Sequence, residues 1–123
     1  MQNPSALDFT KNRQFNRVMI HHTMIVAFDE PIPTDELDTY LEELEELTMD
    51  TGAFESFAAR HHLRVPGDDH APVAVASAVV RFGLTDLGAL DSAFALPGVG
   101  EFIGRWQARR PYKAIWVNHE PLA

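Results

Sequence analysis

The sequence predicts an α+β domain of the ferredoxin-like type, with its elements in the order β-α-β-β-α-β. Runs with two-residue alternation mark strands, and apolar residues at helical spacing mark two helical regions. Two of the expected strands also follow each other directly, with only a polar loop between them. A chain of 123 residues has room for one such domain. We therefore expect a four-stranded antiparallel sheet with the helices on one face.

The first expected strand covers residues 18–28, and apolar side chains occupy both of its alternating faces. This pattern is typical of a central strand covered on two sides. After a turn over residues 29–33, Thr34 is the expected N-cap of a helix, with Asp35 and Glu36 at the positive end of the helix dipole. Leucines and Tyr40 recur there at helical spacing, and Gly52 is the expected stop.

Two strands are expected over residues 53–65 and 73–82, joined by a polar loop over residues 66–72. In the second of them three small residues share a face and leave space above the sheet: Ala74, Ala76 and Ala78. Thr85 is the expected cap of the next helix, which Pro97 and Gly98 interrupt and Pro111 ends. The last strand is expected over residues 114–119.

The sheet face away from the helices requires a cover, because its side chains are expected to be apolar. Alternation assigns to it His22, Met24, Val26, Phe57, Ala76, Ala78 and Trp116. Such a patch is larger than monomers usually expose. A second copy related by two-fold symmetry would cover it. We therefore predict a homodimeric barrel whose apolar cavity binds a small-molecule ligand.

Composition excludes several classes of function. The absence of cysteine rules out disulfides, thiolate metal sites and a cysteine nucleophile. The net charge of -8 argues against a nucleic-acid partner. No apolar run is long enough for a membrane span or a signal peptide, so we expect a cytoplasmic protein without a membrane partner. We expect residues 1–17 to form an N-terminal arm, either flexible or packed across a partner subunit, and residues 18–123 to form the domain.

The residues His-Thr-Met-Ile-Val-Ala-Phe over 22–28, followed by a turn and an acidic amphipathic helix, resemble the opening of the stress-responsive dimeric α/β-barrel (Dabb) family. The resemblance covers most of residues 18–120, including the helix break Leu-Pro-Gly-Val-Gly at 96–100. That family includes polyketide cyclases of the olivetolic acid type and a plant hydroxynitrile lyase. The resemblance implies that His22 lines the barrel cavity, with Met24 and Val26 on its wall and Tyr40 at an aromatic position of the first helix.

The chain departs from the cyclase members of that family at their acid-base pair. Those members place a catalytic histidine after the proline and a tyrosine before it. Val99 stands at the place of the histidine and Ala93 near that of the tyrosine. The resemblance therefore implies the barrel and its cavity without the cyclase pair.

Histidines are the most informative polar residues, because a pKa of about 6.5 permits proton exchange at neutral pH. In each adjacent pair, His21-His22 and His61-His62, a strand sends one member to each face. Parity assigns His22 and His61 to the cavity as catalytic candidates, although a one-residue slip would turn His21 inward. Both also fit a structural, hydrogen-bonded role. The ligand-binding candidates are Met24, Tyr40, Phe57, Ala78, Trp116 and Asn118.

Trp116 fits either the dimer interface or stacking on a planar ligand, and Asn118 fits either a substrate carbonyl or a strand-end cap. The histidines and aspartates over 61–70 follow no metal-ligand spacing, so we predict no metal. No cofactor is predicted either. Three functions stay open: an acid-base lyase, isomerase or cyclase that uses His22, a non-catalytic stress-responsive binding protein, and, by fold analogy, a cofactor-independent monooxygenase.

Overall fold

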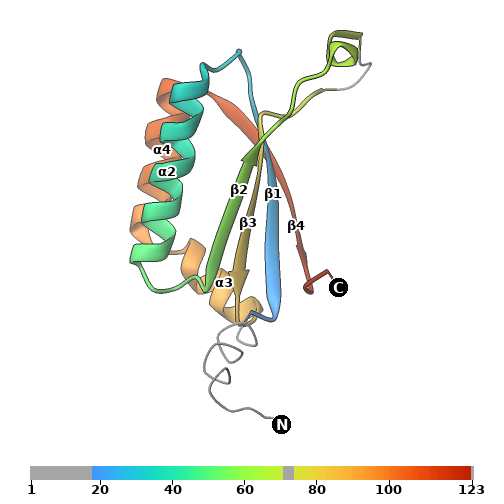
Figure 1. The fold of residues 1–123 in the computed structure, drawn as a ribbon. Coiled ribbons are helices and arrows are strands. Elements are labelled where there is room, and N and C mark those ends of the chain that lie inside the picture. Colours follow the sequence, from blue (N-terminus) through green and yellow to red (C-terminus); the bar gives the residue numbers. More distant parts are fainter. Residues whose placement is uncertain (1–17, 71–73, 123) are drawn as a thin grey trace.

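The computed structural model describes residues 18–70 and 74–122, so the expected arm over residues 1–17 lies outside the described part. The α+β class and the order β-α-β-β-α-β are confirmed (Figure 1). The strands are β1 (Ile20–Phe28), β2 (Ser56–His61), β3 (Ala78–Leu84) and β4 (Tyr112–His119). The helices are α2 (Thr34–Asp50), α3 (Leu87–Phe94) and α4 (Pro97–Arg109), and a short 3-10 turn, η1, spans Pro66–His70.

The four strands form one antiparallel sheet in the order β2-β3-β1-β4. β1 is central and pairs with β3 on one side and β4 on the other. The helices cover one face of β1, which accounts for the apolar side chains on that face. The apolar side chains on its other face belong to the open face of the sheet. All three helices lie on the same side of the sheet in Figure 1.

Two expected strands are shorter or shifted. β2 ends at His61 instead of residue 65, and β3 begins at Ala78 and runs on to Leu84. The expected start of that strand at residue 73 lies outside the described part. Of the three alanines, only Ala78 belongs to the strand. Residues 62–70 form an arm that projects from the sheet in Figure 1. The Asp68 carboxylate organises it by accepting hydrogen bonds from His62 and from the Val65 backbone.

The helix starts differ by one residue from the sequence prediction. Pro33 occupies the N-cap position of α2 and Thr34 is its first residue, with no side-chain cap. Asp86, not Thr85, caps α3: its carboxylate accepts a hydrogen bond from the Ala89 backbone at 2.7 Å. The expected interruption at Pro97 is confirmed, because α4 begins there. A proline at the first helical turn loses no hydrogen bond, since its position has no helical acceptor.

The face of the sheet that meets the helices carries the set that we expected on the open face. His22 (5% exposed), Val26 (0%) and Ala78 (3%) are buried beneath the helices. They share that face with Phe82, which is the registered neighbour of His22. The prediction was wrong because both alternating sets of β1 are apolar. Alternation separates two sets of side chains, and only packing of the bulky aromatic residues decides which set the helices cover.

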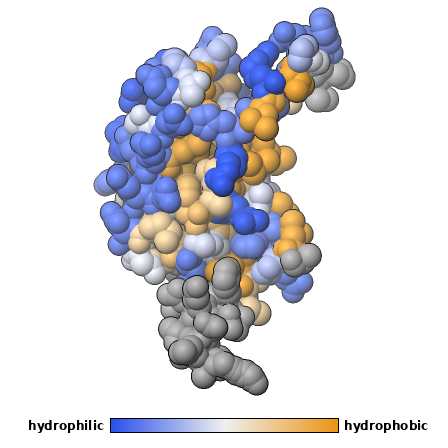
Figure 2. Space-filling view, viewed as in Figure 1, coloured by the Kyte–Doolittle hydropathy of each residue, from blue (hydrophilic) through white to orange (hydrophobic). Residues whose placement is uncertain are grey.

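The open face therefore consists of the other set. Ile25, Val79, Ile115 and Val117 are its exposed apolar residues, and Ile115 is 70% exposed. His21, Thr23 and Arg81 lie among them by register. Figure 2 shows hydrophilic residues along the helix layer and hydrophobic residues gathered toward the strands, with hydrophilic ones between them. An exposed apolar face exists as predicted, although with different residues.

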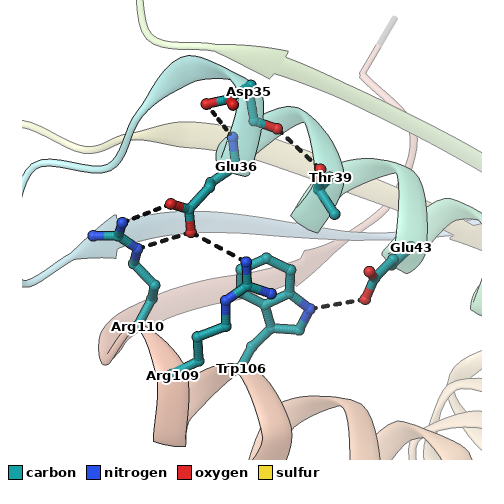
Figure 3. A network of polar contacts seen from close by, with 7 residues as sticks. All are labelled: Asp35, Glu36, Thr39, Glu43, Trp106, Arg109 and Arg110. Atoms are coloured by element: carbon teal, nitrogen blue, oxygen red, sulfur yellow. Dashed lines mark hydrogen bonds and ion pairs between the residues drawn. The ribbon is translucent and has the colours of Figure 1, made fainter.

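Polar contacts join α2 to α4 (Figure 3). Arg110 donates two hydrogen bonds to the Glu36 carboxylate, at 3.0 and 2.7 Å, and Arg109 adds a third at 3.4 Å. The Arg110 hydrogen bonds hold the pKa of Glu36 below its usual value. One turn further along, the Trp106 indole donates to Glu43 at 3.0 Å. These contacts fix the two long helices side by side above the sheet.

Candidate functional site

A cavity of about 720 Å³ lies between the helix-covered face of the sheet and the helices. This size is within the range of small-molecule sites, which are mostly apolar with a few polar groups. Its sheet side is formed by His22, Met24, Phe82, Ala114, Trp116 and Asn118. Its helix side is largely aliphatic and aromatic, with Leu90, Phe94, Val99 and Phe102 among its residues. The cavity therefore favours an apolar or aromatic molecule that makes a few polar contacts.

His22 is the buried polar group of the cavity wall. Its Nδ1 lies 2.7 Å from the Oδ1 atom of Asn118, its registered neighbour on β4. The imidazole ring is also surrounded by aromatic rings, with centroid distances of 4.9 Å to Phe94, 5.6 Å to Phe82 and 5.7 Å to Trp116. Packing and the hydrogen bond together fix the orientation of the ring.

The surroundings of His22 keep its ring neutral. Burial lowers the pKa of His22, and the hydrogen bond with Asn118 opposes this shift more weakly. In the orientation that places Asn118 Oδ1 against Nδ1, this ring nitrogen is the donor and carries the proton. Asn118 is also the only hydrogen-bond partner of this ring among the described residues. Nε2 is therefore left with its lone pair, the form of histidine that accepts a proton.

Tyr40 lies toward the other end of the cavity. Its ring packs edge-on against Phe28, which is six residues along β1 from His22, a span of about 20 Å of strand. It also packs edge-on against Tyr112, another cavity residue. Burial raises the pKa of both tyrosine hydroxyls. Both stay protonated at neutral pH; the Tyr40 hydroxyl donates its hydrogen to Tyr112, so only the Tyr112 hydroxyl keeps a donor for a ligand, and Tyr40 does not assist His22 directly.

The structure brings most of the sequence-predicted site residues together. His22, Trp116 and Asn118 form one cluster, and Met24 and Tyr40 line the same cavity. Ala78 is buried in the core and does not line it. His22, rather than His21, faces this space.

His61 and Phe57 line a different hollow, a cleft of about 550 Å³ between α2 and the edge strand β2. His61 Nε2 pairs there with the Asp38 carboxylate at 2.7 Å. Parity correctly placed His61 on the same sheet face as His22, although that face meets the helices and not the open side as expected. Its register differs, however: His61 is level with Ala78, which pairs with Val26, four residues along β1 from His22. The expectation that His61 shares a cavity with His22 is therefore wrong.

Of the three aromatic residues that enclose His22, sequence reasoning included Trp116 and missed Phe82 and Phe94. Phe82 carried a usable signal, because alternation groups it with Ala78 and pairing sets it opposite His22. Phe94 carried none, since only the packing of α3 brings it within 4.9 Å of the His22 ring. Gln107 and Tyr112 were also missed; they exchange two hydrogen bonds, at 2.8 and 3.1 Å, at the cavity wall.

Two further classes of feature were sought in the described residues. Over 18–70 and 74–122 no three histidine or acidic side chains gather closely enough to hold a metal ion. In the same part of the chain, every helix is too short or too polar to cross a membrane.

No family model and no curated protein matches this sequence. Solved structures do match its fold. A dabb family protein of Mesorhizobium loti with a ferredoxin-like fold has a TM-score of 0.66 at 14% identity, over 86% of this chain and 99% of that one. The chain has the ferredoxin-like fold of the Dabb proteins.

Two other Dabb-like structures bear on the site and on assembly. Hydroxynitrile lyase from Passiflora edulis has a TM-score of 0.66 at 10% identity, over 86% of this chain and 95% of that one. A dimeric ferredoxin-like protein of unknown function from Thermobifida fusca has a TM-score of 0.64 at 12% identity, over 85% of this chain and 92% of that one. These TM-scores show that the fold is shared. Because the sequence identities are so low, the chemistry has to be argued from the site.

Proposed function

We propose that this chain works as a homodimer that binds a small apolar or aromatic molecule in the helix-side cavity, where His22 exchanges a proton with it. The observation that carries the proposal is the His22–Asn118 pair at 2.7 Å, set in an apolar wall that lowers the pKa of the histidine. A neutral, oriented imidazole with one unshared lone pair is a general base.

The chemistry follows from the position of the proton. Nε2 accepts a proton from an O–H or an acidic C–H group of the ligand, and the Asn118 amide oxygen stabilises the resulting imidazolium through Nδ1–H. The same Nε2 returns the proton to the product. One histidine that removes and returns a proton suits a lyase or an isomerase. Trp116, beside His22, offers a flat ring on which a planar ligand can stack.

A non-catalytic binding protein is the second candidate. It is favoured by the aliphatic Val99, which lines the cavity where the resemblance to cyclases implies a histidine. Ionisable side chains are scarce on this wall. In this alternative the His22–Asn118 pair only positions a ligand. The two candidates predict the same binding and differ in turnover.

The first experiment measures the ring directly. Histidine ¹⁵N resonances should report the Nδ1–H form of His22 with a pKa below 6.5, and benzaldehyde should shift the Nε2 resonance on binding. Asn118→Ala should remove the preference for the Nδ1–H tautomer of His22 without unfolding the chain. A His22 ring that carries its proton on Nε2, or that does not respond to an aromatic ligand, would contradict the proposal.

The second experiment measures turnover. A structure of the same fold is a hydroxynitrile lyase, so an aromatic cyanohydrin is a reasonable first substrate. The base would take the hydroxyl proton of mandelonitrile, the carbon–carbon bond to cyanide would break, and hydrogen cyanide and benzaldehyde would leave. His22→Gln should abolish benzaldehyde release, whereas His62→Gln, in the arm, should retain it. Binding of benzaldehyde without turnover of this cyanohydrin or of related carbon acids would favour the non-catalytic candidate.

A further inference from the structure

The open face of the sheet has an unusual charge distribution. Although the chain has a net charge of -8, none of the four strands contains an aspartate or a glutamate. The charged side chains that they place on the open face are Arg60, Arg81 and Lys113. Lys113 is paired with Asp29 at 3.0 Å. Among the described residues, neither Arg60 nor Arg81 has an ion-pair partner.

Arg81 stands near the centre of this face. It is the registered neighbour of Thr23 on β1 and of Ala58 on β2. Arg60 is next to it on the diagonal, because Arg60 pairs with Val79 two residues away. Arg81 and Arg60 are thus diagonal neighbours on the open face, and Arg60 Nη1 donates a hydrogen bond to the Ala59 backbone carbonyl at 2.7 Å.

A second observation concerns His21, which lies close enough to Arg81 for the positive charge to affect it. The Nδ1 atom of His21 is buried and has no hydrogen-bond partner among the described residues. Burial lowers the pKa of His21 first, and the positive charge of Arg81 lowers it further. A neighbouring anion would give the two arginines a counter-charge and would offset the effect of Arg81 on the pKa of His21.

The two arginines open onto a hollow of about 630 Å³ on the same face. Its remaining wall is mostly aliphatic and includes Val79, Val117 and Leu122. The Thr23 hydroxyl and His119 Nε2, which also line it, are 2.6 Å apart and hydrogen-bond each other. The ligand that matches such a surface has one anionic end and one apolar end.

We propose that this hollow binds an amphipathic carboxylate whose anionic end pairs with Arg81 and Arg60. Its hydrocarbon part lies on the aliphatic wall, and Arg81 supplies the fork of donors that suits a carboxylate. The site lies on the opposite side of the sheet from His22, so it is separate from the cavity proposed for catalysis. In the proposed homodimer, pairing through this face would double the positive charge, and a carboxylate bound by each protomer would offset half of it.

Calorimetric titration of the full chain with octanoate tests the proposal, with 1-octanol and acetate as matched ligands that lack the charge or the chain. We expect octanoate to bind at least tenfold more tightly than either. Arg81→Gln and Arg60→Gln should each weaken octanoate by about tenfold, because each removes a charge-assisted contact. Arg81→Lys should retain part of the binding, which distinguishes lost charge from lost fold. Arg64→Gln, an exposed arginine of the arm, is the matched control and should leave binding unchanged.

Three results would overturn the inference: equal binding of octanol, equal binding of acetate, or octanoate binding that His22→Gln removes and Arg81→Gln preserves. The last would place the ligand in the helix-side cavity. Sedimentation in the same solutions separates this inference from the proposed assembly. A chain that is dimeric but does not bind octanoate would retain the homodimer and lose the carboxylate site.

Discussion

The two faces of the sheet present adjacent histidines to opposite environments. His22 is enclosed by aromatic rings and hydrogen-bonded to Asn118, whereas His21 lies on the open face beside Arg81 and the ring of His119. Burial lowers the pKa of both, but only His21 is also affected by positive charge. The two histidines therefore differ in what they can do because their surroundings differ, although the residue type is the same. A shift of one residue along β1 leads from His22, an oriented base in the cavity, to His21, a histidine beside the arginines of the open face.

The largest effect is expected from a charge placed on the open face. Ile115→Glu buries an unpaired carboxylate if two copies meet there, and should weaken the dimer by 100-fold or more, since uncompensated burial of a charge costs several kcal/mol. Sedimentation equilibrium measures the dissociation constant. Met49→Glu, an exposed apolar residue of α2, is the control and should leave it unchanged. An Ile115→Glu dimer as tight as the original would show that this face is not the interface.

Two adjacent valines on β3 allow the packing of the two sheet faces to be compared by mutation. Val80 is 0% exposed beneath the helices and Val79 is 38% exposed on the open face. Val80→Ala should lower the free energy of unfolding by about 2 kcal/mol, and Val79→Ala by less than about 1 kcal/mol. Urea unfolding at one fixed protomer concentration gives both values. Equal losses would mean that the open face is as tightly packed as the core.

The pH dependence of stability compares the two histidines. A histidine with a lowered folded pKa binds fewer protons when folded, so the free energy of unfolding decreases as the pH falls below about 6.5, until the lower folded pKa is passed. His22→Gln should flatten this decrease, measured by urea unfolding between pH 7.5 and 5. Addition of octanoate should reduce the contribution of His21, because an anion near Arg81 favours its protonated form. An unchanged pH profile in His22→Gln would show that the folded pKa of His22 is not lowered.

The smallest effect is expected at the helix contact of Figure 3. Arg110→Gln removes two hydrogen bonds to Glu36, but the pair is partly exposed, and surface ion pairs contribute little. The urea midpoint should fall slightly at low salt, and the difference from the original chain should nearly vanish in 1 M salt. A large, salt-independent loss would show that this network holds the helices more strongly than exposed charges usually do.

The elements, and the choice of His22 over His21 as the histidine that lines the cavity, were largely predictable. The alternation of β1, the leucine spacing of α2 and the break at Pro97 depend on local preferences that each segment carries in its own residues. Boundaries such as the end of β2 at His61 were not predictable, because strand pairing also depends on the neighbour, and residues 62–65 keep alternating after the sheet has ended.

By itself, the sequence determined the class of the fold, the order of its elements and the partition of each strand into two sets of side chains. Only the tertiary structure decided which set meets the helices, that His22 pairs with Asn118 while His61 pairs with Asp38, and that Arg60 and Arg81 gather on the open face. Periodicity is a property of neighbours along the chain. The helix layer, the strand order and the register bring together residues distant in sequence, and pattern alone does not encode these contacts.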